Sequence, residues 1–137
     1  MRLDPVRIEE TRSWFKKACD DLRAASVDMA ADPPLIEDAL FHCQQAIEKA
    51  MKGFLAWHDR PFRKTHSLME LGLICSELDP TLEETLRRAA GLSEYATVYR
   101  YPGEIAPPSE EEAADARKLA EEVLSQVLGR LPAEIAP

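Results

Sequence analysis

Basic side chains gather in one stretch of an otherwise acidic chain. From Lys49 to His66 the sequence has five lysine or arginine residues and a single acidic one, Asp59, whereas the whole chain has a net charge of −8. Arginine binds phosphate as a planar fork, and lysine binds it as a point charge. The stretch is therefore a candidate site for phosphate, a nucleotide or RNA.

Other chemistry is sparsely represented. There is no glycine-rich phosphate loop and no HExxH motif. The histidines lack metal-ligand spacing with the cysteines or with one another; they are His42, His58 and His66. We therefore expect no metal site and no cofactor. The cysteines fall at apolar positions of helical patterns, which predicts small buried thiols in a reducing compartment; they are Cys19, Cys43 and Cys75.

The composition indicates one globular domain. The 137 residues are 45% hydrophobic and 31% charged, which is typical of a folded soluble chain. We expect a single domain over 1–137, with a core at about 6–131 and a frayed tail at 132–137. The acidic balance argues against a protein that coats nucleic acid through bulk electrostatics. The N-terminus is charged at once and no apolar run approaches the roughly 18 residues of a membrane helix, so a cytoplasmic location is expected.

Apolar residues recur at steps of three and four along most of the chain, and no useful segment alternates with period two. This periodicity predicts helices. Prolines and glycines separate the periodic segments, so short loops and antiparallel neighbours are expected. The predicted fold is all-α, an up-and-down bundle of about five helices, at about 6–30, 34–58, 65–78, 79–99 and 109–131.

Capping signals predict where several helices begin. A serine or threonine three residues before a glutamate can form a capping box. Three pairs fit this spacing: Ser67 with Glu70, Thr81 with Glu84, and Ser109 with Glu112. Asp32 followed by Pro33 predicts the start of the second helix.

The expected alternation of helix directions places the basic stretch in the bundle. The connection after the second helix would lie at the same end as the end of the fourth helix, beside the N–H groups that begin the third. The predicted anion site consists of Lys49, Lys52, Arg63, His66, Arg100 and Tyr101. The alternative is that these charges are solvated or are paired with Glu9, Glu10 or Glu104.

The back of the second helix is a second candidate surface. At about 100° per residue, Phe41, Gln45 and Lys52 project opposite the apolar stripe, with Glu48 and Leu55 to one side. A phenylalanine there suggests a partner helix, most simply from a second copy of the chain. The predicted interface consists of Phe41, Gln45, Glu48 and Leu55. The alternative is a central second helix that is buried on both sides.

The segment "FHCQQAIEKAMKGFLAWHDRPFRKTHSLMEL" contains a "QQA.EK..K..L" helix followed by a "THSL" entry to the next helix. In this it resembles the central signature of the HEPN domain family. "VYRYP" resembles its "RYP" element, and "FKKACDDLRAA" fits its first helix. The match spans about residues 9 to 128.

The resemblance implies a helical bundle that dimerises, binds nucleotides and pairs with a small nucleotidyltransferase of the MNT type in a toxin–antitoxin-like pair. Some branches are metal-independent ribonucleases that use an arginine followed four to six residues later by a histidine. Here no histidine follows Arg100. The only pair at this spacing, Arg60 with His66, falls in a loop where that motif does not usually sit.

We therefore expect a non-catalytic nucleotide- or phosphate-binding partner protein, in which Tyr101 could stack on a base. One alternative is a ribonuclease toxin that uses Arg60 to stabilise charge and His66 as general acid or base. Another is a helical scaffold without a ligand.

Overall fold

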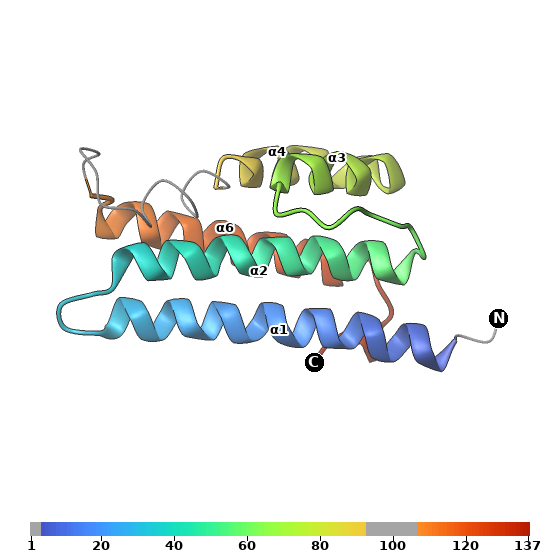
Figure 1. Ribbon diagram of the computed structural model, residues 1–137, viewed down its shortest axis with the longest axis horizontal. Helices are drawn as coiled ribbons and strands as arrows, with labels where there is room; N and C mark the ends of the chain where they lie inside the picture. The colour runs from blue at the N-terminus through green and yellow to red at the C-terminus, as the bar shows by residue number, and fades with distance from the viewer. Residues whose placement is uncertain (1–3, 93–106) are drawn as a thin grey trace.

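The computed structural model describes residues 4–92 and 107–137. These residues form helices and no strand, so the predicted all-α bundle is confirmed. The elements are α1 (Pro5–Ala30), α2 (Ile36–Trp57), α3 (Leu68–Leu78), η1 (Pro80–Leu82), α4 (Glu83–Ala90), α6 (Glu110–Leu128) and η2 (Ala133–Ile135). Three long helices, α1, α2 and α6, lie side by side, and the shorter pair α3 and α4 covers them on one side (Figure 1).

The central helix is α2, which packs on α1, α6 and α3. Its apolar stripe is buried as expected, but so are residues on its other side. Glu48 is 3% exposed, Lys52 is 7% exposed and Leu55 is completely buried. The prediction that Glu48 and Leu55 belong to an outward interface is therefore wrong, because neighbouring helices and the following connection enclose α2.

The third helix does not reverse direction. Residues 58–67, which we call the connection, run back along α2, so that α2 and α3 point the same way (Figure 1). Ten residues can reach about 33 Å when extended, which is enough for this return. The contact between His66 and Glu48 shows the result, since Glu48 lies about 13 Å before the end of α2. The prediction that the whole connection lies at the end of the bundle where α2 finishes is therefore wrong.

Helix starts follow the capping prediction in two of four places. The Ser67 hydroxyl accepts from the Glu70 N–H at 3.2 Å, and the Ser109 hydroxyl accepts from the Glu112 N–H at 3.1 Å. Asp79, in place of Thr81, caps the turn that leads into α4.

The second helix begins at Ile36 without a side-chain cap, later than Asp32 and Pro33 predict. Pro34 explains the delay, because a residue that precedes a proline is disfavoured in the helical region.

The C-terminal tail is ordered, contrary to expectation. Ile135 is completely buried in the core, and the turn Ala133–Ile135 packs against α1. The buried isoleucine contributes about 1.5–3 kcal/mol toward holding the segment against the bundle.

Gly53 permits the close approach of α1 and α2. A Cβ atom on Gly53 would lie 2.7 Å from Cε2 of the completely buried Phe15. Gly72 in α3 is different, because a Cβ atom there would meet Leu86 at an ordinary 3.5 Å.

Gly53→Ala is expected to lower the free energy of unfolding by about 1–2 kcal/mol, since overpacking outweighs the better helix propensity of alanine. Gly72→Ala, the matched control, is expected to raise it by about 0.5–1 kcal/mol. Urea unfolding followed by circular dichroism measures both. Equal effects of the two substitutions would contradict the close approach at Gly53.

Candidate functional site

A buried carboxylate on α2 organises the region where the connection passes. Glu48 accepts from Lys52 Nζ at 3.3 Å and from His66 Nδ1 at 3.0 Å. Gln44 Nε2 approaches the same carboxylate at 3.4 Å. Residues four apart share one face of a helix, so Gln44, Glu48 and Lys52 form a polar row on α2, and the connection brings His66 to it. We call these four residues the Glu48 cluster.

Two aromatic rings close the Glu48 cluster on the side of α1. Lys52 Nζ lies 5.7 Å from the ring centroid of Trp14 and 5.9 Å from that of Phe62. The two rings meet edge to face with centroids 6.4 Å apart. On folding, the Lys52 ammonium group loses contact with water and gains one carboxylate and two aromatic rings as neighbours. Each of these is a favourable partner for a cation.

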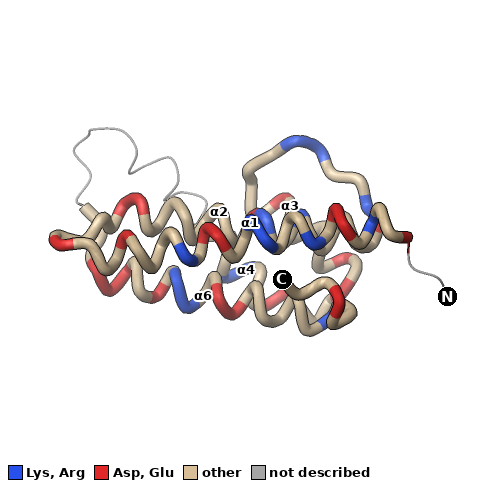
Figure 2. The backbone as a smooth tube through the Cα atoms, turned by 90° about the horizontal axis from the view of Figure 1, so that it is seen from below, with Lys and Arg blue, Asp and Glu red and all other residues tan. Residues whose placement is uncertain are grey.

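Cations on the connection face solvent. The connection stands out from the bundle, with Lys and Arg at its crest (Figure 2). The side chains of Arg63 and His66 are 74% and 77% exposed. Arg63 Nε donates to Glu70 at 2.6 Å, and this hydrogen bond lowers the pKa of Glu70. Lys64 is exposed and forms no ion pair within 4–92 and 107–137.

The ribonuclease pair is not assembled within one chain. Arg60 Nη2 lies 3.1 Å from Glu77, near the end of α3, whereas His66 directly precedes the Ser67 cap at its start. The 11 residues of α3 span about 16 Å, so the two groups lie near opposite ends of that helix. They do not act together on one phosphate in this arrangement.

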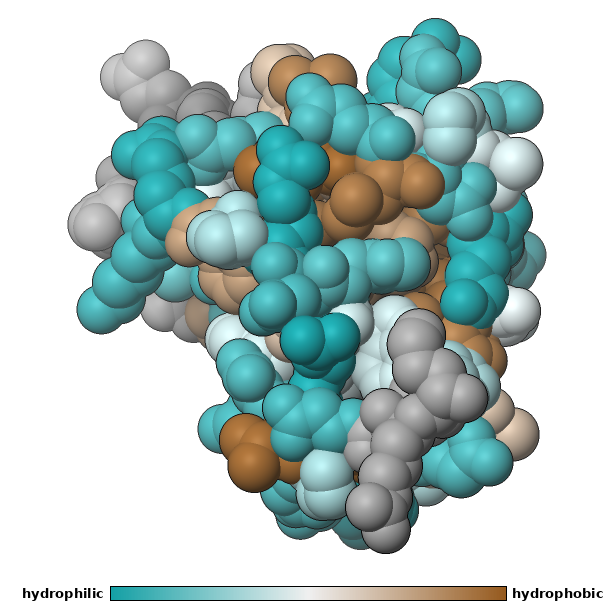
Figure 3. Space-filling model, turned by 90° about the vertical axis from the view of Figure 1, so that its right-hand side faces the viewer, coloured by the Kyte–Doolittle hydropathy of each residue, from teal (hydrophilic) through white to brown (hydrophobic). Residues whose placement is uncertain are grey.

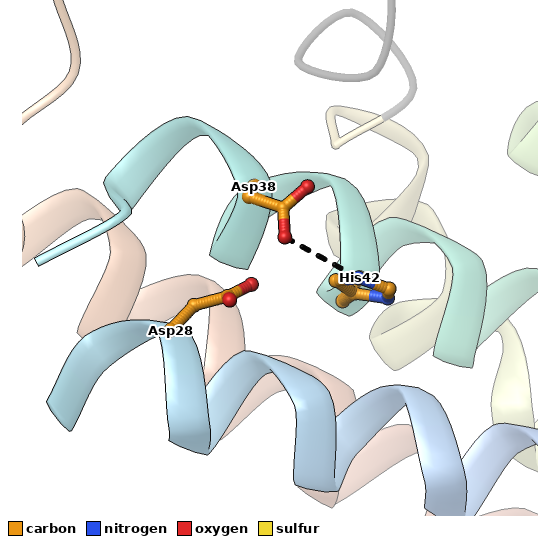
Figure 4. Close-up of side chains that lie close together, drawn as sticks. All are labelled: Asp28, Asp38 and His42. Atoms are coloured by element: carbon orange, nitrogen blue, oxygen red, sulfur yellow. Dashed lines mark ion pairs between the residues drawn. The ribbon is translucent and has the colours of Figure 1, made fainter. Parts of the chain in front are cut away.

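A second polar cluster lies between α1 and α2. Asp21 is 8% exposed and accepts from Lys49 Nζ, and His42 Nδ1 donates to it at 2.9 Å. His42 Nε2 faces the carboxylate of Asp38 at 3.5 Å. Asp28 completes the group from the last turns of α1 (Figure 4). Burial, and then the neighbouring Asp38 carboxylate, raise the pKa of Asp28 to about 6.

The predicted anion site is therefore only partly brought together. Arg63 and His66 lie on the exposed connection, but Lys49 and Lys52 are engaged at the boundary with α1. Their acidic partners are Asp21 and Glu48, which the sequence interpretation did not consider for this role. Arg100 and Tyr101, like Glu104, lie outside the described residues. The end of the bundle where α2 finishes shows hydrophobic surface framed by hydrophilic side chains, not a continuous polar face (Figure 3).

A sequence signal for the missed partners exists. Trp14, Asp21 and Asp28 are spaced by seven on α1, so they share one face of that helix. In the antiparallel pairing with α2 they meet Lys52, then Lys49 with His42, then Asp38. Asp21 in this row, opposite Lys49 and His42 on the next helix, is thus the sequence signal for a buried polar cluster.

Glu48→Ala is expected to lower the free energy of unfolding by about 3 kcal/mol, because it leaves the buried Lys52 cation without its carboxylate. Glu121→Ala is the matched control. It breaks the exposed pair with Arg117 on α6 and is expected to cost less than about 1 kcal/mol. Urea unfolding at neutral pH compares them; equal losses would contradict the buried role of Glu48.

Comparison with known proteins identifies the family. The model of the HEPN domain matches residues 11–130, which run from the first half of α1 to just past α6. No curated protein and no solved structure matches the chain. Among the described helices, none is both long enough and apolar enough to cross a membrane. With a matched region that covers most of its length, the chain belongs to the HEPN domain family.

Proposed function

We propose that the protein is a non-catalytic HEPN-domain protein that binds a nucleotide or another phosphate-bearing ligand at the connection. It does so as a homodimer and as the partner of a small nucleotidyltransferase of the MNT type, in a toxin–antitoxin-like pair. The nucleotidyltransferase follows from the resemblance to paired HEPN proteins. The ligand site is supported by the exposed basic side chains of the connection and by Phe62 in the same segment, which packs against Trp14.

The observation that carries the ligand proposal is the composition of the connection. Arg63, Lys64 and His66 face solvent, while Phe62 in the same segment packs edge to face against Trp14. Arginine and lysine supply donors for phosphate oxygens, and aromatic rings supply surfaces on which a base can stack. The chain has a net charge of −8, so its overall electrostatic field does not attract anions. A local group of basic side chains can still bind them.

The internal ion pairs set how tightly an anion can bind. A phosphate must compete with Glu70 for Arg63 and with Glu48 for His66. Both side chains are exposed, and salt screens exposed charges such as that of Arg63 over about 8–10 Å at physiological ionic strength. The expected affinity is therefore weak to moderate and falls with salt.

Calorimetry with ATP, GTP and a short RNA is expected to show binding at low salt that weakens at high salt. Arg63→Ala and Lys64→Ala should each weaken binding about three- to fivefold, since an exposed ion pair contributes up to about 1 kcal/mol. Glu70→Gln should strengthen binding, because it releases Arg63.

Arg117→Ala is the control, since Arg117 pairs with Glu121 on the acidic α6. A loss there equal to the loss in Arg63→Ala would contradict a local site. No binding of any of the three ligands at low salt would favour a scaffold without a ligand. The same titrations with Arg100→Ala test the predicted residue that lies outside the described part.

The homodimer proposal rests on the accessible row of α2. Phe41, Gln45 and Lys49 are only half-buried, whereas most of α2 around them is buried. The Phe41 ring packs against His42 at a centroid distance of 5.5 Å. A phenylalanine beside a polar amide on a narrow accessible row suits a contact between two copies of one helix.

Light scattering is expected to show a dimer in the wild type and a monomer in Phe41→Glu and Gln45→Lys, because both place charge in the contact. Leu73→Glu is the matched control on α3, where Leu73 is 62% exposed, and it should remain dimeric. A monomeric wild type removes the proposal. Loss of the dimer in Leu73→Glu alone would move the interface to α3.

A further inference from the structure

Three side chains with metal-binding atoms converge between α1 and α2. Asp28 comes from the last turns of α1, and Asp38 and His42 lie one turn apart on α2. One atom from each, two carboxylate oxygens and one ring nitrogen, lie within 4.8 Å of one another. Figure 4 shows the Asp28 and Asp38 carboxylates directed toward the space beside His42. Two ligands of one tetrahedral metal ion lie about 3.3–3.6 Å apart, since each bond is about 2.0–2.2 Å, so a bound ion would draw these atoms closer together.

Asp28 has a buried oxygen without a partner. The residue is 8% exposed, and its Oδ2 atom makes no hydrogen bond with the part of the chain that the structure describes. A buried carboxylate oxygen that faces a second carboxylate is unfavourable unless a proton or a cation lies between them. The buried oxygen thus points to a missing positive group.

The surroundings of His42 suit a metal ligand. The Asp21 carboxylate lies 2.9 Å from the Nδ1 atom of His42, and the Nε2 atom on the other side of the ring faces Asp38 at 3.5 Å. A histidine that binds a metal commonly donates its other ring nitrogen to a carboxylate in this way. Lys49 also pairs with Asp21, which holds that carboxylate in place.

The site is open to solvent on one side. The Asp38 side chain is 49% exposed and borders a groove of about 380 Å³ that is also lined by Pro34, Glu37 and Pro107. The His42 side chain is also partly exposed, so water can complete the coordination of an ion held there.

We propose that Asp28, Asp38 and His42 bind a divalent transition-metal ion such as Zn²⁺ or Mn²⁺. The mixed set of oxygen and imidazole ligands favours these ions over Ca²⁺ and Mg²⁺, which prefer oxygen alone. The ion replaces the missing positive group at Asp28 and ties the end of α1 to the start of α2. The site is separate from the cations of the connection, so its failure leaves the proposed nucleotide site unaffected.

Calorimetry on the full chain, stripped with a chelator and kept reduced, tests the proposal with ZnCl₂ and with MnCl₂. We expect one ion per chain and a higher thermal midpoint with metal. Asp28→Asn and His42→Gln should each weaken binding at least 100-fold. Asp21→Asn should weaken it about 10- to 100-fold, as expected for a positioning residue.

Glu37→Gln, beside Asp38 on the same helix, is the matched control and should bind like the wild type. Helical circular dichroism verifies that each variant is folded; Asp28→Asn keeps the shape of the side chain. Absence of binding, or wild-type binding by both Asp28→Asn and His42→Gln, would overturn the proposal. Zinc binding that only Cys19→Ser removes would also overturn it, because it assigns the ion to that half-buried thiol.

Discussion

The burial of charge on α2 is the constraint on which the rest of the structure depends. A central helix must present every face to a neighbour, and α2 has Gln44, Glu48 and Lys52 where a surface helix would have solvent. Buried ions are tolerated when they are paired and hydrogen-bonded. The connection supplies His66 and Phe62 and α1 supplies Trp14, so the path of the chain after α2 follows from the need to satisfy this row.

This requirement explains why residues of the proposed ligand site on the connection also make structural contacts. His66 touches the buried carboxylate with one nitrogen while most of its side chain stays in solvent. Arg63 is tied to Glu70 in the first turn of α3. A ligand that draws either cation outward must therefore act on groups that also hold α3 against α2.

The sequence predicts the helices well and their relative directions less well. Apolar periodicity and the serines at 67 and 109 define local structure, because caps and helical faces depend on neighbours in sequence. The return of the connection depends on tertiary contacts of Phe62 and His66, which have no local signature. Ile135 was missed for the same reason, since a short tail shows no period.

The sequence predicted the exposed residues of the candidate site but did not predict the buried acidic partners of its lysines. Arg63 and His66 are accessible, as expected for a cluster of cations in a loop. Lys49 and Lys52 were identified without Asp21 and Glu48, because a count of charges along the chain treats each as solvated. The cluster of Asp28, Asp38 and His42 was not predicted, because metal-ligand spacing was considered only among histidines and cysteines. Its three side chains come from two different helices.

The close contact between Gly53 and Phe15 has a consequence for the register of the α1–α2 hairpin. It leaves no room for a side chain there, so the two helices meet at one setting along their axes. A slide of one helical turn, about 5.4 Å, would separate Trp14 from Lys52 and Asp21 from both Lys49 and His42 at the same time. Such polar pairs add little net stability, but together they make every other alignment of the two helices unfavourable. The register of the hairpin is thus determined within the hairpin itself. The glycine sets how the two helices are aligned, and the polar pairs make other alignments unfavourable.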